Sequence, residues 1–346
     1  MGQLLINQAK LRSIGRSLYV SLANISGFPW FIQVETTTKC NLKCEMCEHN
    51  ILSDTTKIID FEEFKKIHKT INKSNPLAKL FPRLQLFDLT GIGESLLNKD
   101  FIKILNYLKS TGATVTFTTN ATLLNDSISK KIIDSGVDVV FFSVDGASKK
   151  TYEKIRVGAN FERVKENIRR FNELRVLSKN KKPKTIIRFL ASSWNVHEMP
   201  EIINFAKETG VPTVTITNMN TSEDTAHLKA DMNKFYEMKD ITTKRAKRLG
   251  VVADYGFIKQ RPMNECRRAF NSMYLTVNGQ VLPCCFINQG GEYDDIAENK
   301  NLGDVFKQNI KQIWKSNKYK NFRKLIKEGK APDVCKNCYL FYPTKK

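Results

Sequence analysis

The stretch "FIQVETTTKCNLKCEMCEHN" (31–50) places an apolar strand before three cysteines, Cys40, Cys44 and Cys47. A structural zinc site or a ferredoxin-type cluster takes four protein ligands. No fourth cysteine lies nearby, and His49 follows Cys47 by only two residues, so one metal position is left without a protein ligand. An open position is typical of a catalytic metal site. The stretch therefore predicts a reactive metal centre at the end of a strand.

Apolar runs that resemble strands alternate with amphipathic stretches along the chain. The predicted strands cover 31–37, 84–90, 114–119, 137–144, 185–191 and 213–217. Asp60 and Asn98 are suitable helix N-caps, and Gly112 and Gly136 suit helix ends. Six strand–helix units in alternation predict an α/β fold, a partial (βα)6 TIM-like barrel that is short of the usual eight units.

Distinctive short motifs follow the predicted strands. The sequence reads "GIGES" at 91–95, "TTNAT" at 118–122 and "SVDG" at 143–146. In a parallel barrel the functional residues lie at the carboxyl ends of the strands. We therefore expect these motifs and the cysteine stretch to converge on one rim.

The C-x3-C-x2-C spacing after a first strand, together with these motifs, resembles the radical S-adenosylmethionine (SAM) superfamily. The resemblance implies a [4Fe–4S] cluster held by Cys40, Cys44 and Cys47, with SAM on the fourth iron. Reductive cleavage of SAM then gives a 5′-deoxyadenosyl radical that abstracts hydrogen from a substrate. Zinc is disfavoured here because no fourth ligand completes the site.

The same resemblance implies which residues bind SAM. "GIGES" is similar to the family's Gly-Gly-Glu motif, in which Glu94 would hold the SAM amino group. "TTNAT" is similar to Thr-Asn-Gly, with Ala121 in place of glycine. The implied cofactor-binding residues are Gly91, Gly93, Glu94, Asn120, Ser143 and Arg156. Plain turn or helix-pairing roles stay open for Asn120 and Arg156, and no catalytic base is identified.

A second cysteine group lies near the C-terminus. "MYLTVNGQVLPCC" (273–285) predicts a β-hairpin that turns at Asn278-Gly279. Cys266, Cys284, Cys335 and Cys338 give four thiolates from three segments. This region resembles a shortened SPASM (Twitch-like) extension, which implies one auxiliary [4Fe–4S] cluster. Because four cysteines leave no iron open for a ligand, we expect that cluster to be an electron acceptor. Zinc also suits four thiolates.

Cys285 is left over from both groups. It could be an alternate cluster ligand, a hydrogen-atom donor or a small buried side chain of the hairpin.

The chain divides into four expected parts. These are an N-terminal amphipathic helix (1–30), the radical SAM partial barrel (31–220), a helical linker (221–262) and a small α+β auxiliary-cluster domain (263–346). Leu11, Ile14, Leu18, Leu22 and Ile25 follow helical spacing beside basic residues. That helix either contacts a membrane or partner, or docks on the barrel.

Composition limits the functional classes. The net charge is +21, but no nucleic-acid motif is present, so nucleic acid is not an expected partner. Residues 300–346 hold thirteen Lys and Arg against three Asp and Glu. No signal peptide or membrane span is recognisable, and clustered cysteines then indicate metal binding in a reducing cytoplasm.

The sequence favours oxidation of a small or sugar-like molecule, with an external electron donor such as flavodoxin or ferredoxin. Peptide maturation is one alternative. A non-catalytic Fe–S electron-transfer protein is another, which the open iron position and "GIGES" disfavour.

Overall fold

The computed structural model describes residues 21, 25–51, 56–75, 77–179, 182–219, 226–256, 261–285, 301–335, 338, 341, 342 and 344. Most of the expected N-terminal helix lies outside these residues, so that helix stays a prediction. Within the described residues, no helix has the length and apolar character needed to cross a membrane.

One curved sheet of nine strands forms the centre of the molecule. Its order is β10-β9-β1-β2-β3-β4-β5-β6-β7, and every neighbouring pair is parallel except β9 and β10. The strands are β1 (Phe31–Val34), β2 (Leu86–Asp88), β3 (Thr114–Thr119), β4 (Val139–Ser143), β5 (Lys184–Ala191), β6 (Thr213–Asn218), β7 (Val252–Gly256), β9 (Ser272–Leu275) and β10 (Val281–Leu282). All six predicted parallel strands are confirmed, and β7 extends their series.

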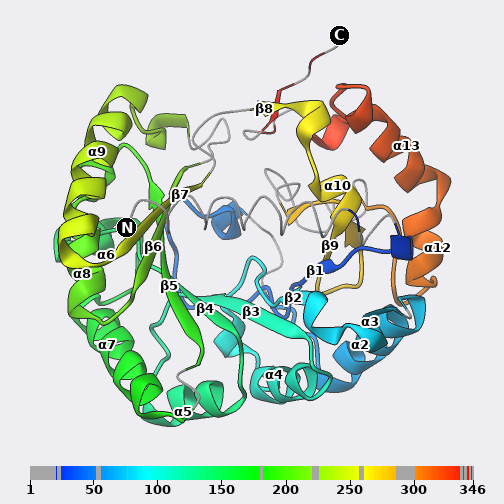
Figure 1. The fold of residues 1–346 in the computed structure, drawn as a ribbon, viewed down its shortest axis with the longest axis horizontal. Coiled ribbons are helices and arrows are strands. Elements are labelled where there is room, and N and C mark those ends of the chain that lie inside the picture. The colour runs from blue at the N-terminus through cyan, green and yellow to red at the C-terminus, as the bar shows by residue number, and fades with distance from the viewer. Residues whose placement is uncertain are drawn as a thin grey trace.

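Helices cover the outer side of the sheet from α2 round to α9 (Figure 1). The α-helices are α2 (Phe61–Ser74), α3 (Leu77–Leu80), α4 (Phe101–Ser110), α5 (Asp126–Asp134), α6 (Lys149–Ile155), α7 (Phe161–Leu177), α8 (Glu201–Glu208), α9 (Met232–Leu249), α10 (Arg268–Asn271), α12 (Ile310–Lys315) and α13 (Asn317–Lys327). Short 3-10 helices are η1 (Glu48–Ile51), η2 (Pro82–Leu84), η3 (Ser95–Leu97), η4 (Val196–Glu198), η5 (Ala226–Leu228), η6 (Met263–Glu265) and η8 (Asp333–Cys335).

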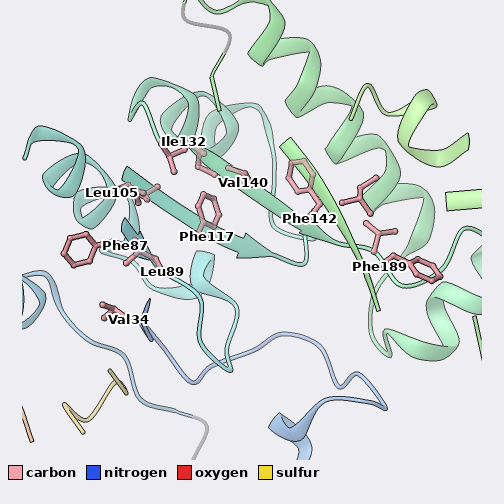
Figure 2. Close-up of a cluster of buried hydrophobic side chains, with 14 of the residues drawn as sticks. Val34, Phe87, Leu89, Leu105, Phe117, Ile132, Val140, Phe142 and Phe189 are labelled. Carbon is pink, nitrogen blue, oxygen red and sulfur yellow. The ribbon is translucent and has the colours of Figure 1, made fainter. Parts of the chain in front are cut away.

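The main core lies between the sheet and this outer layer of helices (Figure 2). Phe117, Phe142 and Phe189 come from three neighbouring strands and are fully buried. Along β5 every second residue is buried and the intervening ones are only partly covered. Alternate side chains of a strand point to opposite faces, so the partly covered ones face the interior of the barrel.

Two predicted helix caps have different outcomes. Asp60 caps α2 and forms a capping box with Glu63, as predicted. Asn98 is not an N-cap: α4 begins at Phe101, and the buried Asn98 amide instead donates 2.9 Å hydrogen bonds to the carbonyls of Thr36 and Ile59. The prediction failed because sequence spacing cannot distinguish a cap from a side chain that joins distant loops.

The predicted hairpin is present, and it belongs to the barrel sheet. β9 and β10 pair across a turn in which Gly279 has a φ of +83°, and β9 also lies parallel to β1. α13 packs on α10 and η6, and β8 (Arg261–Pro262) pairs with β11 (Phe341–Tyr342). The segment expected as a helical linker contains α9 and also the strands β7 and β8.

Candidate functional site

The rim motifs meet through hydrogen bonds between their loops. The Glu94 amide donates to the Lys39 carbonyl at 2.8 Å, which joins the loop after β2 to the loop after β1. The Asn120 amide donates to Glu94 Oε2 at 2.7 Å, and Asn120 Nδ2 donates to Asn41 Oδ1 at 3.0 Å. The ends of β1, β2 and β3 therefore form one polar rim, as the sequence predicts.

The cysteine loop is held by its backbone. The Lys43 and Glu45 amides donate to the carbonyls of Val157 and Ile155, both at 3.0 Å. The Cys47 amide donates to the Cys44 carbonyl at 2.9 Å. The His49 ring is hydrogen-bonded to the Thr38 carbonyl at 2.9 Å, which gives that histidine a structural role within the loop.

The three thiols suit a cationic metal group. Burial raises the pKa of Cys40 and Cys44, and it raises the pKa of Cys47 to about 12. These side chains are therefore neutral thiols near pH 7 unless a metal ion supplies positive charge, which is what iron bound by thiolates does.

Arg156 forms a buried ion pair beside the cysteines. Its Nε donates to Asp145 Oδ2 at 2.8 Å, and Nη2 donates to the same oxygen. Nη1 reaches Cys44 Sγ at 3.9 Å. The Tyr152 hydroxyl is buried without a hydrogen-bond partner among the described residues, close enough for the charge of Cys44 to act on its pKa. Both side chains could donate hydrogen bonds to sulfur atoms of a cluster.

The glycines of "GIGES" bring two loops of the chain together. A Cβ on Gly91 would lie 2.4 Å from Cγ of Glu35, and one on Gly93 would lie 2.4 Å from the Lys39 carbonyl oxygen. Only glycine fits such approaches. The space beside these glycines is occupied by Glu35 and by the backbone at Lys39. This close contact between the two loops places the next residue, Glu94, at the rim.

Glu94 has little acceptor capacity left. Its buried carboxylate accepts from the Leu96 amide at 3.2 Å, the Thr119 hydroxyl at 2.7 Å and the Asn120 amide at 2.7 Å. Burial raises its pKa, and these hydrogen bonds oppose that change. A carboxylate has about four acceptor positions, so about one remains for a ligand ammonium group.

The neighbouring rim positions differ in their contacts. Ala121, in the place of the family's usual glycine, is buried with a φ of +62°. This left-handed conformation explains why glycine suits that position. Ser143 ends β4 half-buried and pairs in register with Arg188 of β5.

The C-terminal cysteines lie in two groups. Cys266, Cys335 and Cys338 pack on a small apolar cluster that includes Met263 and Phe322. Burial raises the pKa of Cys335, and the nearby Cys338 and Cys266 thiols raise it further. Among the described residues, neither these cysteines nor those of the rim form a group of three His, Cys, Asp or Glu side chains placed to hold one metal ion.

Cys284 and Cys285 form the other group. Their thiols are hydrogen-bonded, and this bond is the main cause that lowers the pKa of Cys285. The positive charge of the nearby Arg268 lowers it further. Arg268 Nη1 donates to Cys285 Sγ at 3.6 Å. Cys285 thus contacts an arginine.

Sequence reasoning missed two buried acids that organise the rim. Asp145 holds Arg156 and accepts from the Leu190 amide at 2.7 Å. Glu35 accepts from the Ile92 amide at 3.0 Å and from the Tyr274 hydroxyl at 3.1 Å. Their positions just after β4 and β1 are the one signal that could have identified them.

Comparison with known proteins places these features in families. Residues 34–206 match the model of the radical SAM superfamily, and residues 266–339 match the SPASM model, an iron–sulfur cluster-binding domain. The chain is 26% identical over 328 residues to a tungsten-containing aldehyde ferredoxin oxidoreductase cofactor-modifying protein of Pyrococcus furiosus, covering 90% of this chain and 87% of that protein.

Two further relatives extend the comparison. A probable GTP 3′,8-cyclase of Methanococcus maripaludis is 29% identical over 180 residues, which is 51% of this chain and 55% of that protein. The crystal structure of Streptococcus suis SuiB bound to SAM shares the fold with a TM-score of 0.68 and 16% identity, over 89% of this chain and 72% of SuiB. These matches show that the chain belongs to the radical SAM superfamily, whose domain binds a [4Fe–4S] cluster and SAM, and that it carries a SPASM domain, which binds an auxiliary iron–sulfur cluster.

Proposed function

We propose that this chain is an enzyme that reductively cleaves SAM and abstracts hydrogen from a small molecule, which it then oxidises. The observation that carries the proposal is that the loop bearing Cys40, Cys44 and Cys47 is hydrogen-bonded to Glu94 and Asn120 at one rim. When bound there, the reduced cluster and SAM supply a 5′-deoxyadenosyl radical. A protein that only carries electrons needs no such ligand-binding rim.

The chain's own residues would hold and shield these groups. Cys40, Cys44 and Cys47 would hold three irons and leave the fourth for SAM. The remaining acceptor position of Glu94 would take the SAM ammonium group. Gly91 and Gly93 set the position of that glutamate, Asn120 bonds to it, and Ser143 at the end of β4 would contact SAM from another strand. Arg156 also donates towards Cys44 at 3.9 Å, so it would lie beside the cluster as well as near SAM.

The second cysteine set would hold the auxiliary cluster through Cys266, Cys284, Cys335 and Cys338. Four thiolates leave no iron open for a substrate, which suits electron transfer. The exposed lysines of α13, among them Lys318 and Lys324, would attract an acidic electron donor such as a flavodoxin or ferredoxin.

A small-molecule substrate is favoured over a peptide by the names of two relatives similar in sequence. Their names describe action on a cofactor and on a nucleotide. SuiB has also been solved with a precursor peptide, but that likeness, at 16% identity, is one of fold.

The test is an anaerobic assay of the reconstituted protein with SAM and dithionite. We expect 5′-deoxyadenosine from the wild type and from Cys285→Ala, and none from Cys44→Ala. Cys285→Ala is the matched control because it removes a thiol outside both ligand sets. A wild type that keeps its iron but forms no 5′-deoxyadenosine would identify an electron carrier. Deuterium transfer from labelled small molecules or peptides into 5′-deoxyadenosine then identifies the substrate class.

A further inference from the structure

One charged side chain on the inner face of the barrel has no role in the rim described above. Arg188 lies at the middle of β5, in register with Ser143 of β4 and Thr215 of β6. Its strand neighbours Ile187 and Phe189 are fully buried in the outer core. Because side chains alternate along a strand, Arg188 points to the interior of the barrel.

The Arg188 guanidinium is oriented but mostly unpaired. Nη1 donates to the Thr118 hydroxyl at 2.8 Å, and the guanidinium carbon lies 3.7 Å from the centre of the Phe141 ring. Within the described residues this is its one hydrogen bond, and no carboxylate lies within the 4.0 Å of an ion pair. A guanidinium has five N–H donors, so four remain. No nitrogen of Arg188 is both fully enclosed and without a hydrogen-bond partner.

Charged groups of both signs lie near Arg188. Burial lowers the pKa of Arg188, and nearby Asp88 acts in the opposite direction. Asp88 is itself buried and accepts from the Thr90 hydroxyl at 2.6 Å, and among the described residues no ion pair joins it to Arg188. The N–H groups of Arg188 that bond no residue of the chain therefore remain available to an oxygen anion.

Arg188 also lies below the part of the rim that Asp145 organises, and near Cys285. Two residues further along β5, the Leu190 amide donates to Asp145, which holds Arg156 beside Cys44. Two residues of a strand span about 6.6 Å, so Arg188 lies one step below the rim. On its other side it is near enough to Cys285 for that thiol to act on its pKa.

We propose that Arg188 anchors an anionic group of the substrate, a carboxylate or a phosphoryl group, inside the barrel below the rim. A guanidinium held by Thr118 and by the Phe141 ring presents its free N–H edge in a fixed direction, and that edge matches two oxygens of either group. This inference rests on the proposed function, since it assigns the position of that function's substrate. It restricts the substrate class to small molecules that carry such an anion.

The experiment measures binding of inorganic phosphate, and separately of acetate, to the fully reconstituted protein at constant ionic strength, with and without saturating SAM. Calorimetry gives the affinities. Relaxation of the ³¹P signal in the reduced, paramagnetic protein reports whether phosphate lies near the clusters. The variants are Arg188→Gln, Arg188→Lys and Thr118→Val. Arg163→Gln is the matched control, because Arg163 is an exposed arginine of α7 on the outer side.

We expect Arg188→Gln to weaken binding of the preferred anion by about ten- to hundredfold, the range of a lost charge-assisted pair. Arg188→Lys and Thr118→Val should lie between it and the wild type, and Arg163→Gln should match the wild type. If Arg188→Gln does not fold, the other two variants decide.

Unchanged anion affinity in the Arg188 and Thr118 variants would overturn the inference. So would displacement of the anion by SAM together with weaker SAM binding in Arg188→Gln, because the site would then belong to the SAM carboxylate. Formation of 5′-deoxyadenosine is measured separately. Its absence from the wild type refutes the proposed function, whereas its presence without anion binding refutes only the anchor.

Discussion

The barrel rim and the C-terminal cysteine region present their thiols in different ways. At the rim, all three cysteines lie on one loop whose amides are bonded to residues 155–157, and buried acids fix the neighbouring loops. In the C-terminal region, Cys266, Cys335 and Cys338 pack against a small apolar cluster, whereas Cys284 lies in a separate group with Cys285.

This difference predicts different roles for the bound groups. The backbone of the rim loop is fixed by hydrogen bonds of the chain itself, so its cluster should contribute little to folding. The C-terminal site must bring distant segments together, so its metal group should contribute to folding. Variants that remove one cluster at a time can therefore test the comparison.

The largest expected effect is that of Cys44→Ala on catalysis. The variant should lose 5′-deoxyadenosine formation completely and roughly half of its iron, because two [4Fe–4S] clusters contain equal amounts. Its melting temperature should stay close to that of the wild type, since the backbone bonds of Lys43 and Glu45 do not involve the thiol. Unimpaired SAM cleavage by this variant would exclude the rim as the reactive centre.

Cys335→Ala with Cys338→Ala should give the opposite pattern. We expect SAM cleavage to continue, while the melting temperature falls, because the metal no longer joins η8 to Cys266. Release of oxidised product should stop. Iron analysis, calorimetry and product assays on the same preparation check all three expectations. Normal product yield from the folded variant would instead indicate a structural site, for which zinc is the better metal.

The sequence was sufficient for most of the barrel, but not for the contacts that fix its rim. Strand periodicity located six of the parallel strands and missed β7 and the parallel pairing of β9, and the topology then implied one rim. The pairing of β9 with β1 and the bond from Tyr274 to Glu35 join residues about 240 positions apart, which local patterns do not encode. Asn98 was misassigned for the same reason. Arg156 was found from the motif, but its partner Asp145 depends on the packed structure.

A third prediction tests how strictly the rim is preformed. Gly93→Ala would place a methyl group 2.4 Å from the Lys39 carbonyl oxygen, which requires one loop to move. A displacement of about 1 Å at a positioned group can cost about a hundredfold in rate, so SAM cleavage should fall to that extent. The control is Gly136→Ala at the end of α5, where nothing lies within 4 Å and the φ is +73°.

That control should lose stability by about 1–2 kcal/mol through its left-handed backbone while keeping full SAM cleavage. Equal activity of the two variants would show that the rim can adjust. The rim would then resemble the C-terminal site, whose arrangement is not fixed by contacts of the chain alone.

The smallest effect is expected at Ala121, where the rim contains a strained residue. Replacement by glycine removes a left-handed penalty of about 1–2 kcal/mol. The same change loses a buried methyl group worth about 0.8 kcal/mol and adds about 0.5–1 kcal/mol of chain entropy. The free energy of unfolding should therefore change by less than about 1 kcal/mol. The Ala121 amide and carbonyl keep their bonds to Thr119 and Asn167, so SAM cleavage should be retained.

Ala121→Val is the informative contrast, because a β-branched side chain tolerates this backbone conformation poorly. It should lower both stability and SAM cleavage, as measured by denaturant unfolding and 5′-deoxyadenosine formation. Equal behaviour of the glycine and valine variants would mean that the backbone at this position does not fix the rim.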